Sequence, residues 1–385
     1  MNHVMPIADR PDVVMQRGLG SFLWDLEGTQ YLDFVQGWAV NCLGHCPNEI
    51  HAALSSQSQK LINPSPAFYN EHMMAVSETL ARLSGLDQVF FANSGAEANE
   101  GAIKLARKWG HKHKKGAHTF LVFENGFHGR TLATMSASGK AGWDQLFEPK
   151  VPGFVKVPYG DIEAVRSHIT PQTAGIMLEL IQGEGGVIPA DGAFVKGLRE
   201  LATQHRVLLI IDEVQTGVAR TGDLFAYQHH GILPDILTLG KGLGGGVPVA
   251  ALLANREASV FEFGDQGGTY NGNPLMLAVV AAVLDAVTSP GFLAHVHTQS
   301  DRLKSIAMAH AKDWGVSMVR GRGLLLAMVL THDRAPELCS IARRHGLLVN
   351  APRPNVIRLM PSLRVSDDEI SLFESLFDLA VKDLS

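Results

Sequence analysis

The chain has 385 residues, of which 46% are hydrophobic and 18% are charged, and its formal net charge is −5. This composition is typical of a folded protein with a large apolar core, and it argues against nucleic acid or an anionic membrane as a partner. Three cysteines are too few for a disulfide framework, so we expect a reducing compartment, the cytoplasm.

The N-terminal part of the chain predicts a β-hairpin. The segment MNHVMPIADRPDVVM (1–15) has no continuous apolar stretch, because charged residues interrupt it, and we expect no signal peptide. Residues 20–35 (GSFLWDLEGTQYLDFV) then place Glu27-Gly28 between two β-rich runs, which is typical of a hairpin turn.

Three residues after this hairpin are of types that bind zinc. Cys42, His45 and Cys46 lie within five residues of one another. A structural zinc site needs four ligands, which usually come from two clusters, and no second cluster is visible. We therefore expect no metal site.

Apolar runs alternate with helical patterns through the middle of the chain. Runs that are apolar throughout are typical of strands covered on both faces. The alternation predicts an α/β fold with a mostly parallel, doubly wound sheet and helices on both faces. The expected strands are QVFFA (88–92), TFLVF (119–123), FVKVP (154–158), AGIMLEL (174–180), VLLIID (207–212), ILTLG (236–240) and VPVAALLA (247–254); the expected helices include 96–110, 194–206 and the apolar 275–284.

The first of these strands leads directly into a helix through FFANSGAEANEGAIKLA (90–106). Ser94 is placed as the N-cap, and Glu97 three residues later completes a capping-box pattern. Gly95 and Ala96 are small, so a phosphate could approach the free N–H groups of the helix N-terminus. Taken alone, the segment favours an ordinary capped helix.

The next segment, ENGFHGRT (124–131), places an aromatic ring and two cationic side-chain types in a glycine-containing loop. Phe127 in such a loop can stack on a flat ligand. Arg130 can bind a carboxylate through its planar guanidinium group. His128 could be only a hydrogen-bonding residue of the loop.

The strand-like run VLLIIDEV (207–214) ends in two acids, and ligands of α/β proteins gather beyond the carboxyl ends of parallel strands. Three interpretations stay open. Asp212 and Glu213 could hold a metal ion as in an ATPase, although no G-x-x-x-x-G-K-[ST] motif accompanies them. Asp212 could instead pair with a protonated ring nitrogen. It could also be a helix-capping residue.

Lys241 lies among glycines in ILTLGKGLGGGVP (236–248). Gly240, Gly242 and Gly245 formally match G-x-G-x-x-G, but a strand-like run follows where a dinucleotide site needs a helix. Lys241 is then either a mobile loop lysine or an amine that a large group approaches. In the second case, the glycines would give room to that group.

Together, these segments supply an anion cradle, an aromatic ring, a carboxylate at a strand end and an amine. This set matches what pyridoxal phosphate requires. The chain resembles the class-III, fold-type I aminotransferases, and most closely their acetylornithine aminotransferase subgroup. The motifs that carry the resemblance follow the family's order over nearly the whole chain: NCLGHCP (41–47), FFANSGAEANEGAIKLARK (90–108), GFHGRT (126–131), IQGEGGV (181–187), LLIIDEVQTG (208–217), FAYQHHGILPDILTLGKGLGGGVPV (225–249), GGTYNGNPL (267–275) and VIRLMPSL (356–363).

The resemblance implies a cofactor site for pyridoxal 5′-phosphate. Lys241 would be the Schiff-base lysine and the base of the proton shift, for which its pKa must be lowered. The remaining cofactor contacts would be Asp212 at the ring nitrogen, Gln215 at the phenolic oxygen, the N–H groups of Gly95 and Ala96 at the phosphate, Phe127 on the ring face, and Thr269 at the phosphate of the partner subunit's cofactor. The active unit would therefore be a homodimer.

The resemblance also implies how substrates are held. Arg130 would bind a substrate carboxylate, and Arg358 would receive the α-carboxylate of glutamate or 2-oxoglutarate. Glu184 would gate the site by pairing with an arginine in one half-reaction. Gly268 stands where the family often has serine, at a position that often touches substrate, so the substrate stays open there.

The implied reaction moves the terminal amino group of N2-acetylornithine, or of a close acylated relative, to 2-oxoglutarate, giving the semialdehyde and glutamate. Another ω-amine (ornithine, 4-aminobutyrate, a diamine or a β-amino acid) is the alternative donor, and a nucleotide-binding α/β protein is the alternative class. We expect residues 1–44 and 290–385 to form one smaller α+β domain from both chain ends, and residues 45–289 to form the large cofactor-binding domain.

Overall fold

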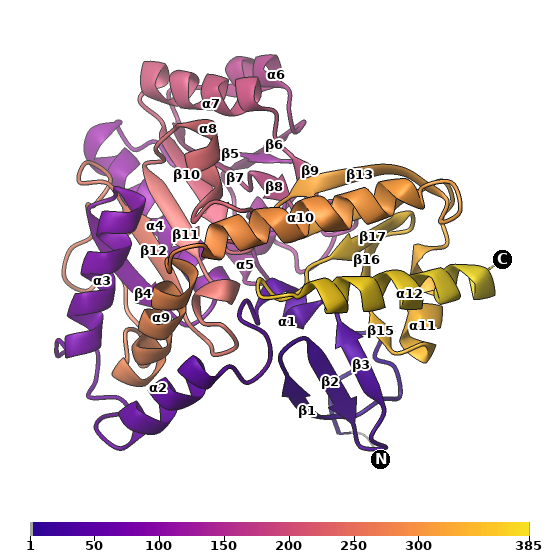
Figure 1. The fold of residues 1–385 in the computed structure, drawn as a ribbon. Helices are drawn as coiled ribbons and strands as arrows, with labels where there is room; N and C mark the ends of the chain where they lie inside the picture. The colour runs from indigo at the N-terminus through magenta and orange to yellow at the C-terminus, as the bar shows by residue number, and fades with distance from the viewer. Residues whose placement is uncertain (1–2, 385) are drawn as a thin grey trace.

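The computed structural model describes residues 3–384, and within them a seven-stranded sheet forms the centre of the molecule (Figure 1). The strand β12 runs antiparallel to both of its neighbours, and the other pairs are parallel. This confirms the predicted mostly parallel sheet. In spatial order, the strands are β4 (Gln88–Ala92), β12 (Ala250–Ala254), β11 (Ile236–Leu239), β10 (Leu208–Glu213), β7 (Thr173–Leu178), β5 (Thr119–Phe123) and β6 (Phe154–Val157).

Both faces of this sheet are covered, which explains why its strands are apolar throughout. In β10, Leu208 and Ile210 pack with α4 (Gly95–His113), whereas Leu209 and Ile211 join the main core cluster on the other face. Successive side chains of a strand point to opposite faces, so each face needs its own apolar set. The other helices of this part are α2 (Asn48–Ser58), α3 (Glu71–Ser84), α5 (Leu132–Ala137), α6 (Ile162–His168), α7 (Gly192–His205), α8 (Ala226–His230) and α9 (Pro274–Val287).

The predicted start of α4 is confirmed, with one difference. Ser94 Oγ accepts a hydrogen bond from the Glu97 N–H at 3.3 Å, as an N-cap does. The Glu97 carboxylate, however, accepts from the Asn93 N–H at 2.7 Å and does not reach back to Ser94. Ala98, Ala102 and Ala106 of this helix are buried, and so is Trp109, with 2% exposure.

A second region joins the two ends of the chain (Figure 1). The predicted hairpin forms from β2 (Phe22–Asp25) and β3 (Gln30–Asp33), and the additional strand β1 (Met15–Leu19) pairs with β2. Near the other end, β15 (Leu347–Leu348) pairs in parallel with β3. The pairing unites the segments that we expected to share a domain. The boundaries at 44 and 289 stay a prediction, and residues 1, 2 and 385 of those ranges lie outside the described residues.

The strands β1, β2, β3 and β15 thus form one four-stranded sheet. The C-terminal part contains another, of order β13-β14-β17-β16. The long helix α10 packs against β13 and β14, and α12 lies beside β15 (Figure 1). The elements are β13 (Val316–Arg322), β14 (Leu325–Leu330), β16 (Asn350–Arg353), β17 (Val356–Leu359), α10 (Phe292–Ala309), α11 (Ala335–Arg344) and α12 (Asp367–Leu384). Three short elements remain: α1 (Gln36–Ala39) follows β3, and β8 (Ile181–Gln182) pairs with β9 (Ile188–Pro189).

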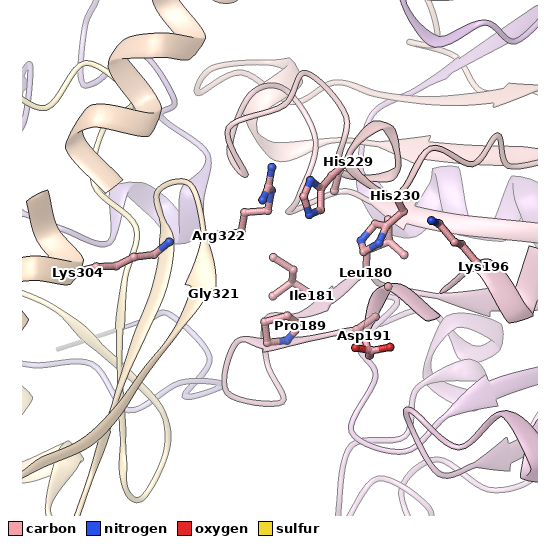
Figure 2. A pocket seen from close by; sticks show the side chains of 13 residues that line it. Leu180, Ile181, Pro189, Asp191, Lys196, His229, His230, Lys304, Gly321 and Arg322 are labelled. Atoms are coloured by element: carbon pink, nitrogen blue, oxygen red, sulfur yellow. The ribbon is translucent and has the colours of Figure 1, made fainter. Parts of the chain in front are cut away.

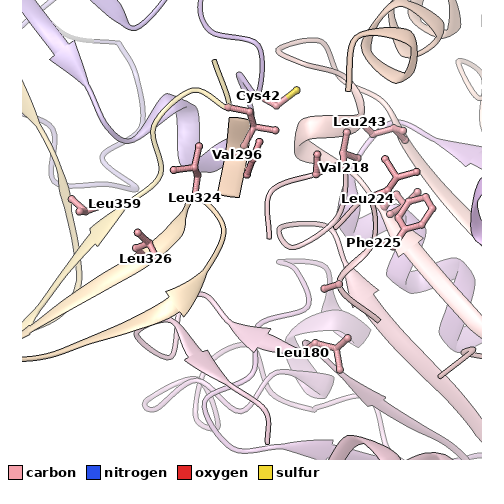
Figure 3. Packing of buried hydrophobic residues seen from close by; sticks show 14 of the residues in the cluster. Cys42, Leu180, Val218, Leu224, Phe225, Leu243, Val296, Leu324, Leu326 and Leu359 are labelled. Atoms are coloured by element: carbon pink, nitrogen blue, oxygen red, sulfur yellow. The ribbon is translucent and has the colours of Figure 1, made fainter. Parts of the chain in front are cut away.

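One continuous core cluster packs the C-terminal part against the large sheet. Figure 3 shows Val218 and Leu243 of the large part facing Leu324 and Val296 of the C-terminal part, and all four are nearly inaccessible to solvent. Burial of apolar surface on this scale fixes the two parts relative to each other. A site built from both parts can therefore keep a fixed geometry.

Over residues 3–384, no single helix is long and apolar enough to cross a membrane. The helices α9 and α10 meet that criterion only as a pair, and the pair bends by 71°. The apolar side chains of α9 belong to the main core cluster.

Candidate active site

A cavity of about 280 Å³ brings together most of the predicted site residues, which come from loops that follow the carboxyl ends of the central strands. It is lined by Gly95, Ala96, Phe127, Arg130, Glu184, Asp212, Gln215 and Lys241, all of which were predicted, and by Asn99, His128, Gly129, Glu179 and Val214, which were not assigned a role. Arg358 reaches the site through its contact with Glu184.

A larger cavity of about 380 Å³ lies elsewhere, beside α7 and α8 (Figure 2). Its polar side chains include Lys196, His230 and Arg322, and Arg322 is already paired with Asp223 at 2.9 Å. None of the predicted site residues lines it. The smaller cavity is therefore the candidate active site, because the reactive groups converge there.

Lys241 begins a short 3-10 helix, Lys241–Leu243, in the loop that connects β11 to the antiparallel strand β12. Burial is the main effect that lowers the pKa of its amine, and the positive charge of Arg358 adds to it. The carboxylates of Asp212, Glu179 and Glu184 act in the opposite direction. A lowered pKa places more of the amine in its neutral, nucleophilic form near neutral pH.

The expectation that the glycines near Lys241 give room to a ligand is wrong for two of them. A Cβ on Gly244 would lie 2.1 Å from the Val247 carbonyl oxygen, and one on Gly245 would lie 2.7 Å from Ile50. Both contacts are with the protein and neither partner lines the cavity. These glycines let the chain reverse tightly against its own core.

Asp212, at the end of β10, is the centre of a buried hydrogen-bond network. Its Oδ2 accepts from Asn99 Nδ2 and contacts His128 Nδ1, each at 2.8 Å, and its Oδ1 accepts from the Val214 N–H at 3.0 Å. Burial alone would lower the pKa of His128, but the hydrogen bond and charge of Asp212 outweigh burial and raise it. The network holds an aspartate carboxylate in a fixed orientation at the cavity.

The Glu213 carboxylate is not part of this network. The interpretation of Asp212 and Glu213 as a pair that holds a metal ion is therefore wrong. The Glu213 carboxylate accepts from the N–H groups of Ala226 and Tyr227 at the start of α8, and burial raises its pKa to about 8. Adjacent residues of a strand face opposite sides of the sheet, which separates the two acids. Among residues 3–384 there is also no group of three His, Cys, Asp or Glu side chains placed to hold a metal ion.

The start of α4 offers two free N–H groups to the cavity. Ser94 Oγ accepts a hydrogen bond from the Glu97 N–H, and the Ser94 carbonyl oxygen accepts one from the Ala98 N–H. In the described part of the chain, nothing accepts a hydrogen bond from Gly95 or Ala96. The helix has 19 residues, and its N-terminus carries a partial positive charge. A Cβ on residue 95 would lie 2.6 Å from Val214, so only glycine keeps this cradle open.

Two predicted residues, Phe127 and Arg130, pack against the same ring, that of Trp143. The rings of Phe127 and Trp143 have centroids 5.6 Å apart, and the Arg130 guanidinium lies 5.5 Å from the Trp143 centroid. Within residues 3–384, Arg130 has no carboxylate partner. An exposed, unpaired guanidinium held by a ring is available to an incoming carboxylate.

The predicted pairing of Glu184 with an arginine has a counterpart in the structure. Glu184 Oε1 lies 3.0 Å from Arg358 Nη2. Burial raises the pKa of Glu184, but the charge and hydrogen bond of Arg358 outweigh it, so the pKa is lowered. Arg358 is 1% exposed, and Asn350 Oδ1 accepts from its Nε and Nη2. Its Nη1 is buried and has no acceptor among the described residues.

The remaining predicted residues are placed differently. Gln215 lines the cavity, and its amide donates weakly to the Trp38 carbonyl oxygen at 3.5 Å. Thr269 and Gly268 do not line the cavity of their own chain. Thr269 is exposed, and its carbonyl oxygen accepts from Asn63 Nδ2 at 3.1 Å. Their assigned contacts stay predictions.

Sequence reasoning did not assign a role to Glu179, which follows β7 and is 8% exposed. Its carboxylate accepts from the Phe127 N–H at 2.9 Å. Burial raises its pKa to about 7, and the charge of Asp212 adds to this, whereas His128 opposes it. The only signal in the sequence was an acid at the end of an apolar run, the same signal that identified Asp212.

We expect the substitution Glu179→Gln to change how stability depends on pH. The folded-state pKa of about 7 lies above the ordinary value of 4.5, so the folded protein holds this proton over a range in which the unfolded chain releases it. Glu179 then lowers the free energy of unfolding as pH rises from about 4.5 to about 7, by on the order of 1 kcal/mol per pH unit. Denaturant titrations of both proteins at several pH values measure the difference, which is absent if Glu179 ionises normally.

Comparison with known proteins gives a consistent result over the whole chain. The model of the family "Aminotransferase class-III" matches residues 5–381. An acetylornithine aminotransferase of Ralstonia nicotianae is 56% identical over 374 residues, which cover 95% of this chain and 94% of that protein. The structure of the ornithine aminotransferase of Toxoplasma gondii aligns with a TM-score of 0.95 at 32% identity, over 99% of this chain and 93% of that one. That of the N-acetylornithine aminotransferase of Stenotrophomonas maltophilia aligns with a TM-score of 0.87 at 34% identity, over 97% of each chain.

Proposed function

The chain belongs to the class-III aminotransferases, and on this premise we propose that it moves the terminal amino group of N2-acetylornithine, or of a close acylated relative, to 2-oxoglutarate with the help of pyridoxal 5′-phosphate. The observation that supports this most is the pair of arginines at one cavity. Arg130 is exposed and has no carboxylate partner in residues 3–384, whereas Arg358 is buried and is neutralised by Glu184. The identity of the Ralstonia nicotianae relative supports the donor.

The two arginines fit two substrates that differ by one carboxylate. N2-acetylornithine carries one carboxylate, which Arg130 would bind while Glu184 stays on Arg358. 2-Oxoglutarate carries two, so its second carboxylate would take the place of Glu184 on Arg358 and would find the free Nη1 there. The same site can then serve both half-reactions without leaving a buried guanidinium unpaired.

The residues of the site fit pyridoxal phosphate. Free N–H groups on Gly95 and Ala96 suit its phosphate, the fixed carboxylate of Asp212 suits a protonated ring nitrogen, and Phe127 lines the same cavity. When bound, the cofactor supplies an aldehyde for the amine and a ring that accepts an electron pair. Gln215 would hold the phenolic oxygen. Lys241 Nζ would carry the proton to and from the carbon that bears the amino group.

We also propose that two chains form the active unit. Large apolar side chains are exposed in two neighbouring segments, which are connected by hydrogen bonds from Asn63 to Thr269 and from Asn70 to Gly272. A second chain would cover this face and would bring Thr269 near the phosphate of its partner's cofactor. The exposed side chains are Leu61, Ile62, Phe68, Tyr69, Met74, Phe263 and Tyr270. Analytical ultracentrifugation should give twice the mass of one chain, and the mass of a single chain would contradict the proposal.

A cytoplasmic location stays a prediction from the cysteine content.

The visible absorption of the purified protein with pyridoxal phosphate tests the reaction. Single amino donors are added without 2-oxoglutarate, and the change in the spectrum of the bound cofactor is recorded for each. N2-acetylornithine should convert the spectrum fastest, and 2-oxoglutarate should then restore it. Conversion by ornithine or 4-aminobutyrate and not by N2-acetylornithine would keep the reaction and overturn the donor. A protein that binds no cofactor would overturn both.

A further inference from the structure

One carboxylate at the entrance of the cavity is shared by two cations. Glu184 Oε1 lies 3.0 Å from Arg358 Nη2, and Glu184 Oε2 lies 3.6 Å from Lys140 Nζ. The two cations come from separate parts of the chain, because Lys140 follows α5 and Arg358 lies in β17. Each oxygen of the carboxylate therefore faces a different partner.

The two partners differ in how firmly they are held. The side chain of Arg358 is 1% exposed, and two of its nitrogens donate to Asn350. The side chains of Lys140 and Glu184 are 33% and 29% exposed. Arg358 is consequently fixed, and any separation of the pair must come from a movement of Glu184. A long, half-exposed lysine can follow that movement.

Lys140 is also kept close to the site. Its Nζ lies 5.4 Å from the centroid of the Trp143 ring, the ring that Phe127 and Arg130 contact as well. Trp143 is buried. A cation over an aromatic face is attracted to it, which counters the tendency of a lysine to extend into solvent. The amine thus stays within reach of the Glu184 carboxylate.

We propose that Lys140 is the second partner of Glu184 and accepts its carboxylate when a substrate carboxylate occupies Arg358. The inference rests on the proposed function, because it requires an acceptor with two carboxylates. Lys140 is then a positioning residue, which acts through Glu184 and does not touch the reacting atoms. At 3.6 Å the amine is too far from the carboxylate for a hydrogen bond while Glu184 is on Arg358. The displaced carboxylate can approach Lys140 more closely, and this gain favours the open form of the Glu184–Arg358 pair.

A positioning role of Lys140 predicts different effects of its substitution on the two half-reactions, whereas a general structural role predicts the same effect on both. In the donor half-reaction, Glu184 stays on Arg358, so the substitution Lys140→Met should leave the rate and the apparent affinity for the donor within about twofold. In the acceptor half-reaction, Glu184 must move, and the apparent Kd for 2-oxoglutarate should rise about fivefold, as expected for a half-exposed ion pair. The maximal rate should change less than that Kd. Stopped-flow absorbance of the cofactor-loaded protein measures the rate and the apparent Kd in each half-reaction.

Three further variants make the test specific. Lys140→Arg keeps the charge and should restore the affinity for 2-oxoglutarate. In a Glu184→Gln background there is no carboxylate to receive, so Lys140→Met should have no further effect. Lys156→Met is the matched control, because Lys156 is similarly exposed, at 28%, and pairs with Asp144 instead of Glu184. It should leave both half-reactions unchanged.

Three results would overturn the proposal. One is an equal change of both half-reactions in Lys140→Met, which a structural role would give. The second is no change in either, and the third is an undiminished effect in the Glu184→Gln background. Each leaves the proposed reaction intact. If the unsubstituted protein does not transfer an amino group to 2-oxoglutarate, the proposed function fails first, and the role of Lys140 fails with it.

Discussion

The substitution Lys241→Ala is expected to reduce transamination by at least about 10⁴-fold, because one side chain would supply both the covalent attachment and the proton transfer. The amine lines the cavity and has a lowered pKa, and alanine has no group that could replace it in either role. Turnover with N2-acetylornithine and 2-oxoglutarate measures the loss. The visible absorption of the bound cofactor should change in parallel.

The matched control is Lys114→Ala. Lys114 is also partly buried, and its Nζ donates to the carbonyl oxygens of Thr173 and His205, away from the cavity. That variant should lose stability and keep its specific activity. If Lys241→Ala retained activity, the assignment of the amine would be wrong, and Lys241 would be a structural residue of the loop.

The substitution Asp212→Asn is expected to lower the rate of each half-reaction by about 10³-fold while the cofactor still binds. Asparagine keeps the shape of the side chain and removes the charge that would hold a ring nitrogen protonated. It also removes the anion that raises the pKa of His128, so that pKa should fall. Stopped-flow absorbance measures the rates, and NMR titration of His128 reports the pKa.

Asp235→Asn serves as the control for charge loss at the same sheet. Asp235 lies before β11, and it is paired with Arg199 at 2.8 Å and with Asn255 at 2.9 Å. We expect this variant to be less stable and to keep both half-reaction rates. Rates for Asp212→Asn within about twofold of the unsubstituted protein would contradict an electronic role for Asp212 and would leave it as a residue that orders the loop.

The local parts of the fold could be predicted from the sequence because their causes are local. Ser94 caps α4 and the Glu27-Gly28 turn forms the hairpin, as expected from neighbouring residues. The strand β12 begins at Ala250 and not at 247, because Pro248 lacks an N–H to donate. The strand β1 was missed because its residues are mostly exposed and show no apolar alternation.

The site could be predicted only in part, for the opposite reason. Family motifs identified Lys241, Asp212 and Arg358, whereas the contacts that orient them join residues far apart in the chain. Glu179 accepts from Phe127, 52 residues away. Lys140 meets Glu184 only through the fold. Spacing and periodicity hold no information about such pairs, and only the packed structure reveals them.

The parallel pairing of β15 with β3 has a consequence for synthesis on the ribosome. The edge of β3 that pairs with residues 347–348 is made more than 300 residues before its partner. At translation rates of about 5–20 residues per second, the backbone groups of this edge lack their partner in β15 for roughly 15–65 s. An open strand edge is a template for pairing with other chains. The nascent hairpin must therefore be kept from pairing with other chains until residues 347–348 have been made.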